Sequence, residues 1–73
     1  MKFNGVKIQD EIARREQSVT DFANSAGLSP GSIYRAMAGA SATTKTLGKI
    51  ARTLGIEKPT ILLQPADRVE ATL

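Results

Sequence analysis

The sequence contains no cysteine, no histidine and no tryptophan. Without thiols it can form no disulfide, and without thiols and imidazoles it lacks the usual ligands of zinc sites. The same two absences exclude a cysteine nucleophile and histidine as an acid–base catalyst. The remaining carboxylates and lysines form no clustered apolar site along the sequence. We therefore expect that the protein is not an enzyme and holds no metal or other cofactor.

Aromatic side chains and long apolar runs are also scarce. The aromatic residues are Phe3, Phe22 and Tyr34, too few to form a platform on which the bases of a single strand stack. No apolar run approaches the roughly 18 residues needed to span a bilayer, and the N-terminal residues lack the apolar core of a signal peptide. We therefore expect a cytoplasmic protein with no membrane contact.

Length and charge limit the class of protein more loosely. The chain of 73 residues allows one domain, and a hydrophobic content of 41% supplies a modest aliphatic core. The net charge of +3 suits a nucleic-acid partner, although many ordinary small proteins are equally basic. Charge alone therefore does not select a function.

Apolar residues recur at helical spacing in five short segments, and no segment shows the alternation of a half-buried strand. The segments expected to be helical are 6–16, 19–26, 30–38, 44–54 and 59–64. We therefore predict the all-α class, with one domain over residues 1–64 and a polar C-terminal tail over residues 65–73.

Capping residues set the bounds of these helices. The candidate N-caps carry a side-chain oxygen that can accept a backbone hydrogen bond: Asn4, Ser18, Ser29 and Thr43, or Thr44 in place of Thr43. Pro30 strengthens the start of the third helix, because proline suits the first helical position. The candidate helix ends are glycines, which tolerate the left-handed conformation: Gly27, Gly39 and Gly55.

The helical register also assigns a core. The side chains expected to face inward lie on one side of each segment: Ile8, Ile12, Phe22, Ala23, Ala26, Ile33, Ala36, Met37, Leu47, Ile50, Ala51, Leu54 and Leu62. Leu28, between the second and third helices, is also expected to be buried. The charged residues of the first segment are interpreted as a solvated helix face, with Arg14 and Arg15 beside Asp10 and Glu11.

The junction of the second and third helices is the most informative feature of the chain. Only Gly27, Leu28 and Ser29 separate the two capped segments. A turn this tight forces the helices to cross steeply, so that the second of the pair can project from the surface. A short protruding helix on a small basic domain is a common means of entering the major groove of DNA.

Over about residues 6–63, the chain resembles the helix-turn-helix family of phage repressors and Cro-like proteins, also called the Xre type. The motifs that carry the resemblance are Phe22-Ala23, Gly27-Leu28-Ser29, Ser32-Ile33-Tyr34-Arg35 followed by Gly39, and the run from Thr46 to Ile56. The resemblance implies a compact five-helix, lambda-repressor-like domain with a central helix-turn-helix. The segment 26–37 with Leu54-Gly55-Ile56 also looks like the antitoxins of addiction modules, a subgroup with the same helical core.

The third helix, the recognition helix of the family, contains the candidate base contacts. Arg35 faces away from the apolar side of this helix, and a guanidinium can bind guanine O6 and N7 with two hydrogen bonds. Ser32 is a candidate for a base or phosphate contact, and the exposed Tyr34 for a phosphate or a thymine methyl group. Gly31 has no side chain to read a base, but it permits close approach. For Arg35, Ser32 and Tyr34 the alternative interpretation is an ordinary surface side chain.

Further residues are expected at the sugar–phosphate backbone. Ser29 and Pro30 begin the third helix, where backbone N–H groups and the Ser29 hydroxyl can meet a phosphate. The resemblance adds Val19, which offers only its backbone N–H. It also adds the loop after the third helix and the start of the fourth: Ser41, Thr43, Thr44 and Lys45. Hydroxyls and a lysine at the positive end of a helix suit an anion, and capping by Thr43 is compatible with that role.

We thus expect a sequence-specific, double-stranded DNA-binding transcriptional regulator, acting as a repressor, that inserts residues 30–38 into the major groove. One such helix reads few base pairs, so a homodimer or a separate dimerising partner is expected. The expected contact surface comprises Ile61, Leu63, Val69 and Leu73. Two alternatives remain: an antitoxin that binds a toxin protein and also regulates its own expression, and a protein-interaction adaptor that has lost DNA reading. No small-molecule site is evident.

Overall fold

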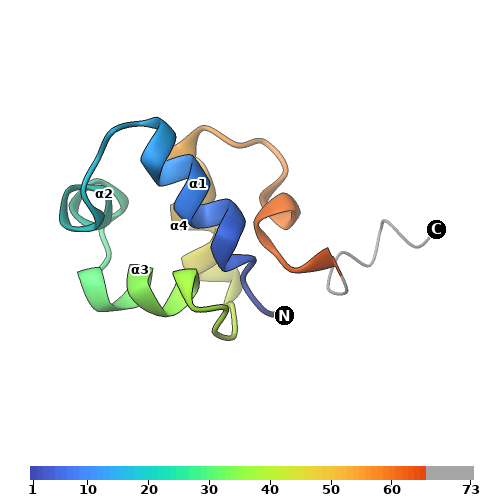
Figure 1. The fold of residues 1–73 in the computed structure, drawn as a ribbon. Helices are drawn as coiled ribbons and strands as arrows, with labels where there is room; N and C mark the ends of the chain where they lie inside the picture. Colours follow the sequence, from blue (N-terminus) through green and yellow to red (C-terminus); the bar gives the residue numbers. More distant parts are fainter. Residues whose placement is uncertain (66–73) are drawn as a thin grey trace.

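The computed structural model describes residues 1–65, which form an all-α fold (Figure 1). The elements are four α-helices and one 3₁₀-helix: α1 (Gly5–Arg14), α2 (Val19–Ala26), α3 (Pro30–Met37), α4 (Thr44–Leu54) and η1 (Pro59–Leu62). The all-α prediction is confirmed, but the expected fifth α-helix is the 3₁₀-helix η1. Its four residues are ended by the extended Leu63, which leaves no room for a second helical turn.

All four α-helices begin at a capping residue that the sequence identifies. In each case the side-chain oxygen of the cap accepts a hydrogen bond from the backbone N–H three residues later. The pairs are Asn4 with Lys7, Ser18 with Asp21, Ser29 with Ser32, and Thr43 with Thr46. Each cap satisfies one of the amide donors that a helix N-terminus otherwise leaves without a partner. These predicted helix starts are confirmed.

The helix ends match the prediction except in α1. Gly27 and Gly55 adopt left-handed backbone angles after α2 and α4, and α3 ends at Met37, next to the expected Ala38. The first helix, expected to reach residue 16, ends at Arg14. Glu16 then takes a φ of 54°, because the chain must reverse before α2 and offers no glycine at this point. A non-glycine residue in this conformation is strained.

The core is a single apolar cluster between the helices. It contains the inward-facing residues of α1, α2, α3 and α4, and the most deeply buried side chains include Phe22, Ile33 and Ile50. Met37 and Leu28 differ from the prediction, since both are half-buried at the edge of the cluster. Among the helices that the structure describes, none has the length and apolar character needed to cross a membrane.

The segment after η1 corrects the expected contact surface between copies. Leu63 is 1% exposed and belongs to the core, where its backbone forms a bridge with Phe3. Ile61 is half-buried and packs against the same cluster. The helical register that placed them outside does not apply, because the chain becomes extended after the short 3₁₀-helix. Val69 and Leu73, which complete that surface, lie outside the described residues.

The connection between α2 and α3 is short and closed by backbone hydrogen bonds. The N–H of Gly27 donates to the Asn24 carbonyl at 3.2 Å, and the N–H of Leu28 to the Ala23 carbonyl at 2.9 Å. In Figure 1, α2 is seen nearly along its axis while α3 runs across the lower edge of the molecule, so their axes cross steeply. One side of α3 faces the core through Ile33 and Ala36, and the other side is left on the surface.

The first three residues form a strap, which we call the N-terminal strap (residues 1–3). On one side, Phe3 N–H donates to the Ala40 carbonyl at 3.0 Å, and Ala42 N–H donates to the Met1 carbonyl at 2.8 Å. On the other side, Gln64 N–H donates to the Lys2 carbonyl at 2.9 Å. The strap therefore joins the loop after α3 to the segment after η1. From the sequence alone, residues 1–5 are expected only to lead into the first helix, with Asn4 as its cap.

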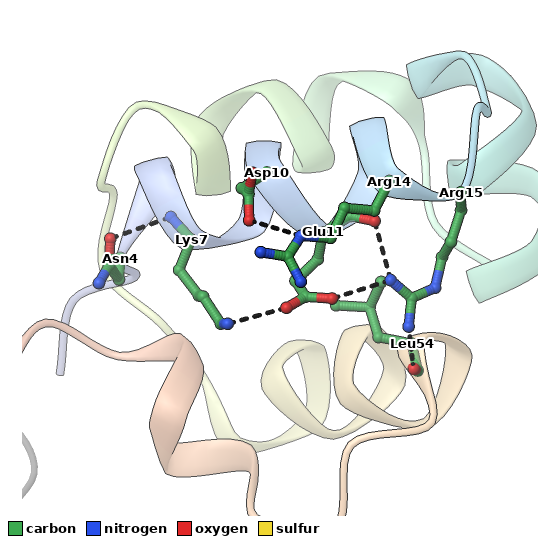
Figure 2. A network of polar contacts seen from close by, with 7 residues as sticks. All are labelled: Asn4, Lys7, Asp10, Glu11, Arg14, Arg15 and Leu54. Atoms are coloured by element: carbon green, nitrogen blue, oxygen red, sulfur yellow. Dashed lines mark hydrogen bonds and ion pairs between the residues drawn. The ribbon is translucent and has the colours of Figure 1, made fainter.

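A polar network ties α1 to the end of α4 (Figure 2). Glu11 forms ion pairs with Lys7 at 2.8 Å and Arg15 at 2.9 Å. Arg15 also donates to the Leu54 carbonyl, one of the last acceptors of α4. The two cations bonded to Glu11 lower the pKa of its carboxyl below the ordinary value. This side of α1 is thus a tertiary contact and not the solvated face that the sequence predicts, although the Asp10–Arg14 pair remains exposed.

Candidate nucleic-acid interface

Three side chains at the start and along the surface of α3 form a hydrogen-bonded row: Ser29, Ser32 and Arg35. The hydroxyls of Ser29 and Ser32 lie 3.1 Å apart, and Nη2 of Arg35 donates to the Ser32 hydroxyl at 3.2 Å. Residues three apart lie on the same face of a helix, so the row runs along one side of α3. We call these three residues the α3 row.

The Arg35 side chain lies back along α3 over Gly31. A Cβ atom built on Gly31 would lie 3.4 Å from Arg35 Nη1, and space around it is otherwise open apart from the Ser29 hydroxyl at 3.9 Å. Helical side chains generally lean toward the N-terminus of their helix, which explains this direction. Gly31 therefore adds no side chain of its own, and it leaves the guanidinium a surface free of steric obstruction.

Tyr34 and Pro30 flank the α3 row. Tyr34 is 58% exposed, as its register predicts, and it lies one residue and therefore about 100° around the helix from Arg35. Pro30 is half-buried at the first position of α3. The predicted base-contact residues thus occupy one exposed side of a single short helix.

A hollow brings some of the predicted base contacts together with some of the predicted backbone contacts. It lies between α3, the loop of residues 38–43 and the start of α4. Its polar lining comes from Ser32, Arg35, Ser41, Thr43 and Thr46, and apolar residues complete it: Phe3, Ala36 and Ala40. The hollow therefore connects the α3 row to the segment expected at the phosphates.

The start of α4 contributes hydroxyls and one cation beside the hollow. Thr43 accepts the Thr46 N–H at 3.2 Å and donates its own hydroxyl to Thr46 Oγ1 at 3.0 Å. Thr44 and Lys45 follow in the first turn and are both exposed, although neither lines the hollow. The first turn of a helix carries partial positive charge, so an anion approaching Lys45 would also meet the favourable end of α4.

Val19 is placed differently from the other predicted contacts. It is the first residue of α2 and is half-buried, with its side chain packed against the core. It does not line the hollow. Any contact that it makes with a phosphate must therefore use its backbone N–H, which lies at the positive end of α2.

The distribution of charge along the sequence favours an anionic partner. From residue 22 to residue 56 the sequence contains no Asp or Glu and has four cations: Arg35, Lys45, Lys49 and Arg52. Residues 1–21 contain four cations and four acidic residues and are neutral. All excess positive charge of the described residues is therefore carried by the part of the chain that builds α3, the hollow and α4.

Sequence reasoning missed Phe3 and Thr46 as parts of this surface. Phe3 reaches the hollow through the long-range pairing of the N-terminal strap, for which the sequence gives no local signal. Thr46 could have been found, because it lies three residues after the cap Thr43 and so shares its face of the helix. The segregation of charge was also visible in the sequence.

No family model matches this chain, and searches among curated proteins and solved structures likewise return no match. The proposed function therefore rests on the residues and their geometry.

Proposed function

We propose that the protein is a sequence-specific, double-stranded DNA-binding regulator of transcription, acting as a repressor, with α2 and α3 as a helix-turn-helix. The observation that carries the proposal is the α3 row, an exposed line of Ser29, Ser32 and Arg35 on a helix that lies within a stretch of sequence, residues 22–56, with four cations and no acidic residue. Such a surface matches the dimensions and the charge of a major groove.

Base reading is assigned first to Arg35. Its guanidinium is exposed and bonded only to a neutral hydroxyl among its described contacts, so turning toward a base breaks no ion pair. Two hydrogen bonds to guanine O6 and N7 would discriminate against other bases by about 1–3 kcal/mol. Ser32 can follow as a hydroxyl donor or acceptor, and Tyr34 can approach a thymine methyl group or a phosphate at the flank.

Backbone contacts are assigned to the two ends of the surface. Ser29 and Pro30 lie at the N-terminus of α3, and Val19 at that of α2, where helix dipoles favour phosphate. Ser41, Thr43, Thr44 and Lys45 lie at the opposite end of the α3 row. Contacts on both sides of a groove fix the position and orientation of a helix without reading sequence.

Two copies of the chain are part of this proposal. A helix of eight residues is about 12 Å long and can contact only a few base pairs. A homodimer on a two-fold related site, or a second protein that dimerises the chain, would double the number of bases read. Because Leu63 is buried, the contact surface that the sequence suggests cannot serve as expected.

The test is selection of bound sequences from a random pool of double-stranded oligonucleotides, followed by affinity measurements on the selected duplex. We expect one enriched motif, and the substitution Arg35→Ala to reduce the preference at one base pair by about 5- to 150-fold, equivalent to 1–3 kcal/mol. Arg52→Ala removes the same charge from the far end of α4 and should leave the motif unchanged.

Two results would overturn parts of the proposal. An unchanged motif with Arg35→Ala would remove Arg35 as the reader of bases. Absence of any binding to duplex DNA at about 50 mM salt would reject the DNA function, because electrostatic affinity for DNA rises as the salt concentration falls. That second result would favour the protein-interaction adaptor.

A further inference from the structure

The N-terminal strap places Lys2 at the border of the candidate interface. Lys2 forms an antiparallel bridge with Ser41, which lines the hollow beside Arg35. Lys2 is 39 residues away from Ser41 in the sequence. Neither helix periodicity nor a local motif connects them, and the contact exists only because the strap pairs with the loop after α3.

The backbone geometry fixes the direction of the Lys2 side chain. Successive residues of an extended segment point to opposite sides, and directly paired residues of neighbouring strands point to the same side. Phe3 points into the core and is 3% exposed, so Lys2 points outward, on the side of Ser41. The strap is hydrogen-bonded on both flanks, by residues 40–42 and by Gln64, so the position of its backbone is well defined.

We propose that Lys2 is a DNA phosphate-contact residue that continues the backbone-binding surface beyond Ser41. This inference rests on the proposed DNA function and adds a residue to it. Lys2, at the border of the hollow, would add a third cation to Arg35, which lines the hollow, and to Lys45, which lies beside it in the first turn of α4. A phosphate near Ser41 would meet a hydroxyl from the loop and an ammonium group from the strap.

The proposal predicts a change in salt dependence. Each phosphate neutralised by a lysine contributes about 0.9 to the slope of log affinity against log salt concentration. Lys2→Gln should lower that slope by about 0.9 on a mixed-sequence duplex. The affinity ratio of wild type to variant should therefore shrink about 3.5-fold between 50 and 200 mM salt. Sequence preference should not change, because a phosphate contact reads no base.

Two variants control for general effects of charge. Arg52→Gln removes one positive charge at the far end of α4, about 12 Å along the helix from Thr44, and should keep the full slope. Lys2→Arg keeps the charge and should restore the wild-type slope. Lys2 accepts the Gln64 N–H with its backbone carbonyl, which Lys2→Gln retains, and an unchanged far-UV circular dichroism melting curve would verify that the fold is kept.

The outcomes separate the two proposals. A wild-type chain that binds no duplex at any salt concentration would overturn the DNA function and this inference with it. A wild-type chain that binds, together with a Lys2→Gln slope equal to that of wild type, would overturn the role of Lys2 alone. An equal loss of slope in Lys2→Gln and Arg52→Gln would also overturn it, because net charge would then explain the effect.

Discussion

Among the glycines, Gly5 has the closest backbone neighbour, because the start of α1 lies directly against the end of α3. A Cβ atom built on Gly5 would collide with the carbonyl oxygen of Met37. This obstacle is backbone, so it cannot move aside as the end of a flexible side chain can. Gly5→Ala should therefore push α1 and α3 apart or prevent them from packing. The change also disturbs α3, the helix that carries the candidate base contacts.

The expected size of the effect follows from two opposing contributions. Overpacking in a close-packed interface costs about 1–3 kcal/mol, occasionally more. Replacing glycine by alanine inside a helix recovers at most about 1 kcal/mol, and Gly5 is the first residue of α1, where the gain is smaller. Gly5→Ala should thus lower the free energy of unfolding by about 1–3 kcal/mol. That loss corresponds to roughly 4–8 °C in Tm for each kcal/mol in a domain of this size.

Gly48 supplies a matched control within the same chain. It lies inside α4, and a Cβ atom there would meet nothing within 4 Å. Gly48→Ala should raise the free energy of unfolding by about 0.5–1 kcal/mol, because alanine is the better helix former. Urea unfolding followed by far-UV circular dichroism measures both variants. Equal shifts of the two variants, or a stabilised Gly5→Ala, would refute the close approach of α1 and α3.

Two further variants test local features of the fold. Glu16→Gly should raise the free energy of unfolding by about 0.5–1 kcal/mol in urea titrations, because the left-handed angle at Glu16 suits glycine; destabilisation would contradict this backbone conformation. Glu11→Gln should lower stability at pH 7 by about 1 kcal/mol through loss of its bonds to Lys7 and Arg15. Because the folded pKa of Glu11 is lowered, its contribution is complete above the ordinary value of 4.5 and is lost as the pH falls through the folded pKa. The urea midpoints of wild type and Glu11→Gln should therefore converge toward pH 3, and a constant difference from pH 7 to pH 3 would disprove the linkage.

The parts of the fold predicted from the sequence are those determined by neighbours within a helical turn. Ser18 and Ser29 are N-caps because a hydroxyl reaches the N–H three residues later, which depends on no distant residue. Gly27 ends α2 for the same local reason. The surface side of α3 also follows from register, so the exposure of Arg35 and Tyr34 is predictable from their positions in the helix alone.

The parts that were missed depend on pairing across the chain. Leu63 is buried because the strap crosses it, and Arg15 caps α4 because the fold brings the end of α1 within hydrogen-bonding distance of the end of α4. Phe3 lines the hollow for the same kind of reason. Glu16 shows the converse, since the sequence favours continued helix while the path to α2 requires a left-handed residue. Within the four α-helices, local pattern therefore predicts which residues face outward, and tertiary pairing decides which of them lie together.

The composition of the α3 surface bears on how specificity could arise. Specific DNA binding typically exceeds non-specific binding by about 4–10 kcal/mol. One bidentate arginine supplies about 1–3 kcal/mol, and Gly31 and Pro30 occupy positions in α3 that offer no polar side chain. Ser32 and Tyr34 add single contacts, so one copy of the chain falls near or below the lower limit. Two copies on a two-fold site would double the base contacts and bring the sum into the typical range. On the proposed function, association of two chains is therefore a requirement for selective binding, and the affinity for a selected duplex should depend on protein concentration more steeply than one-to-one binding allows.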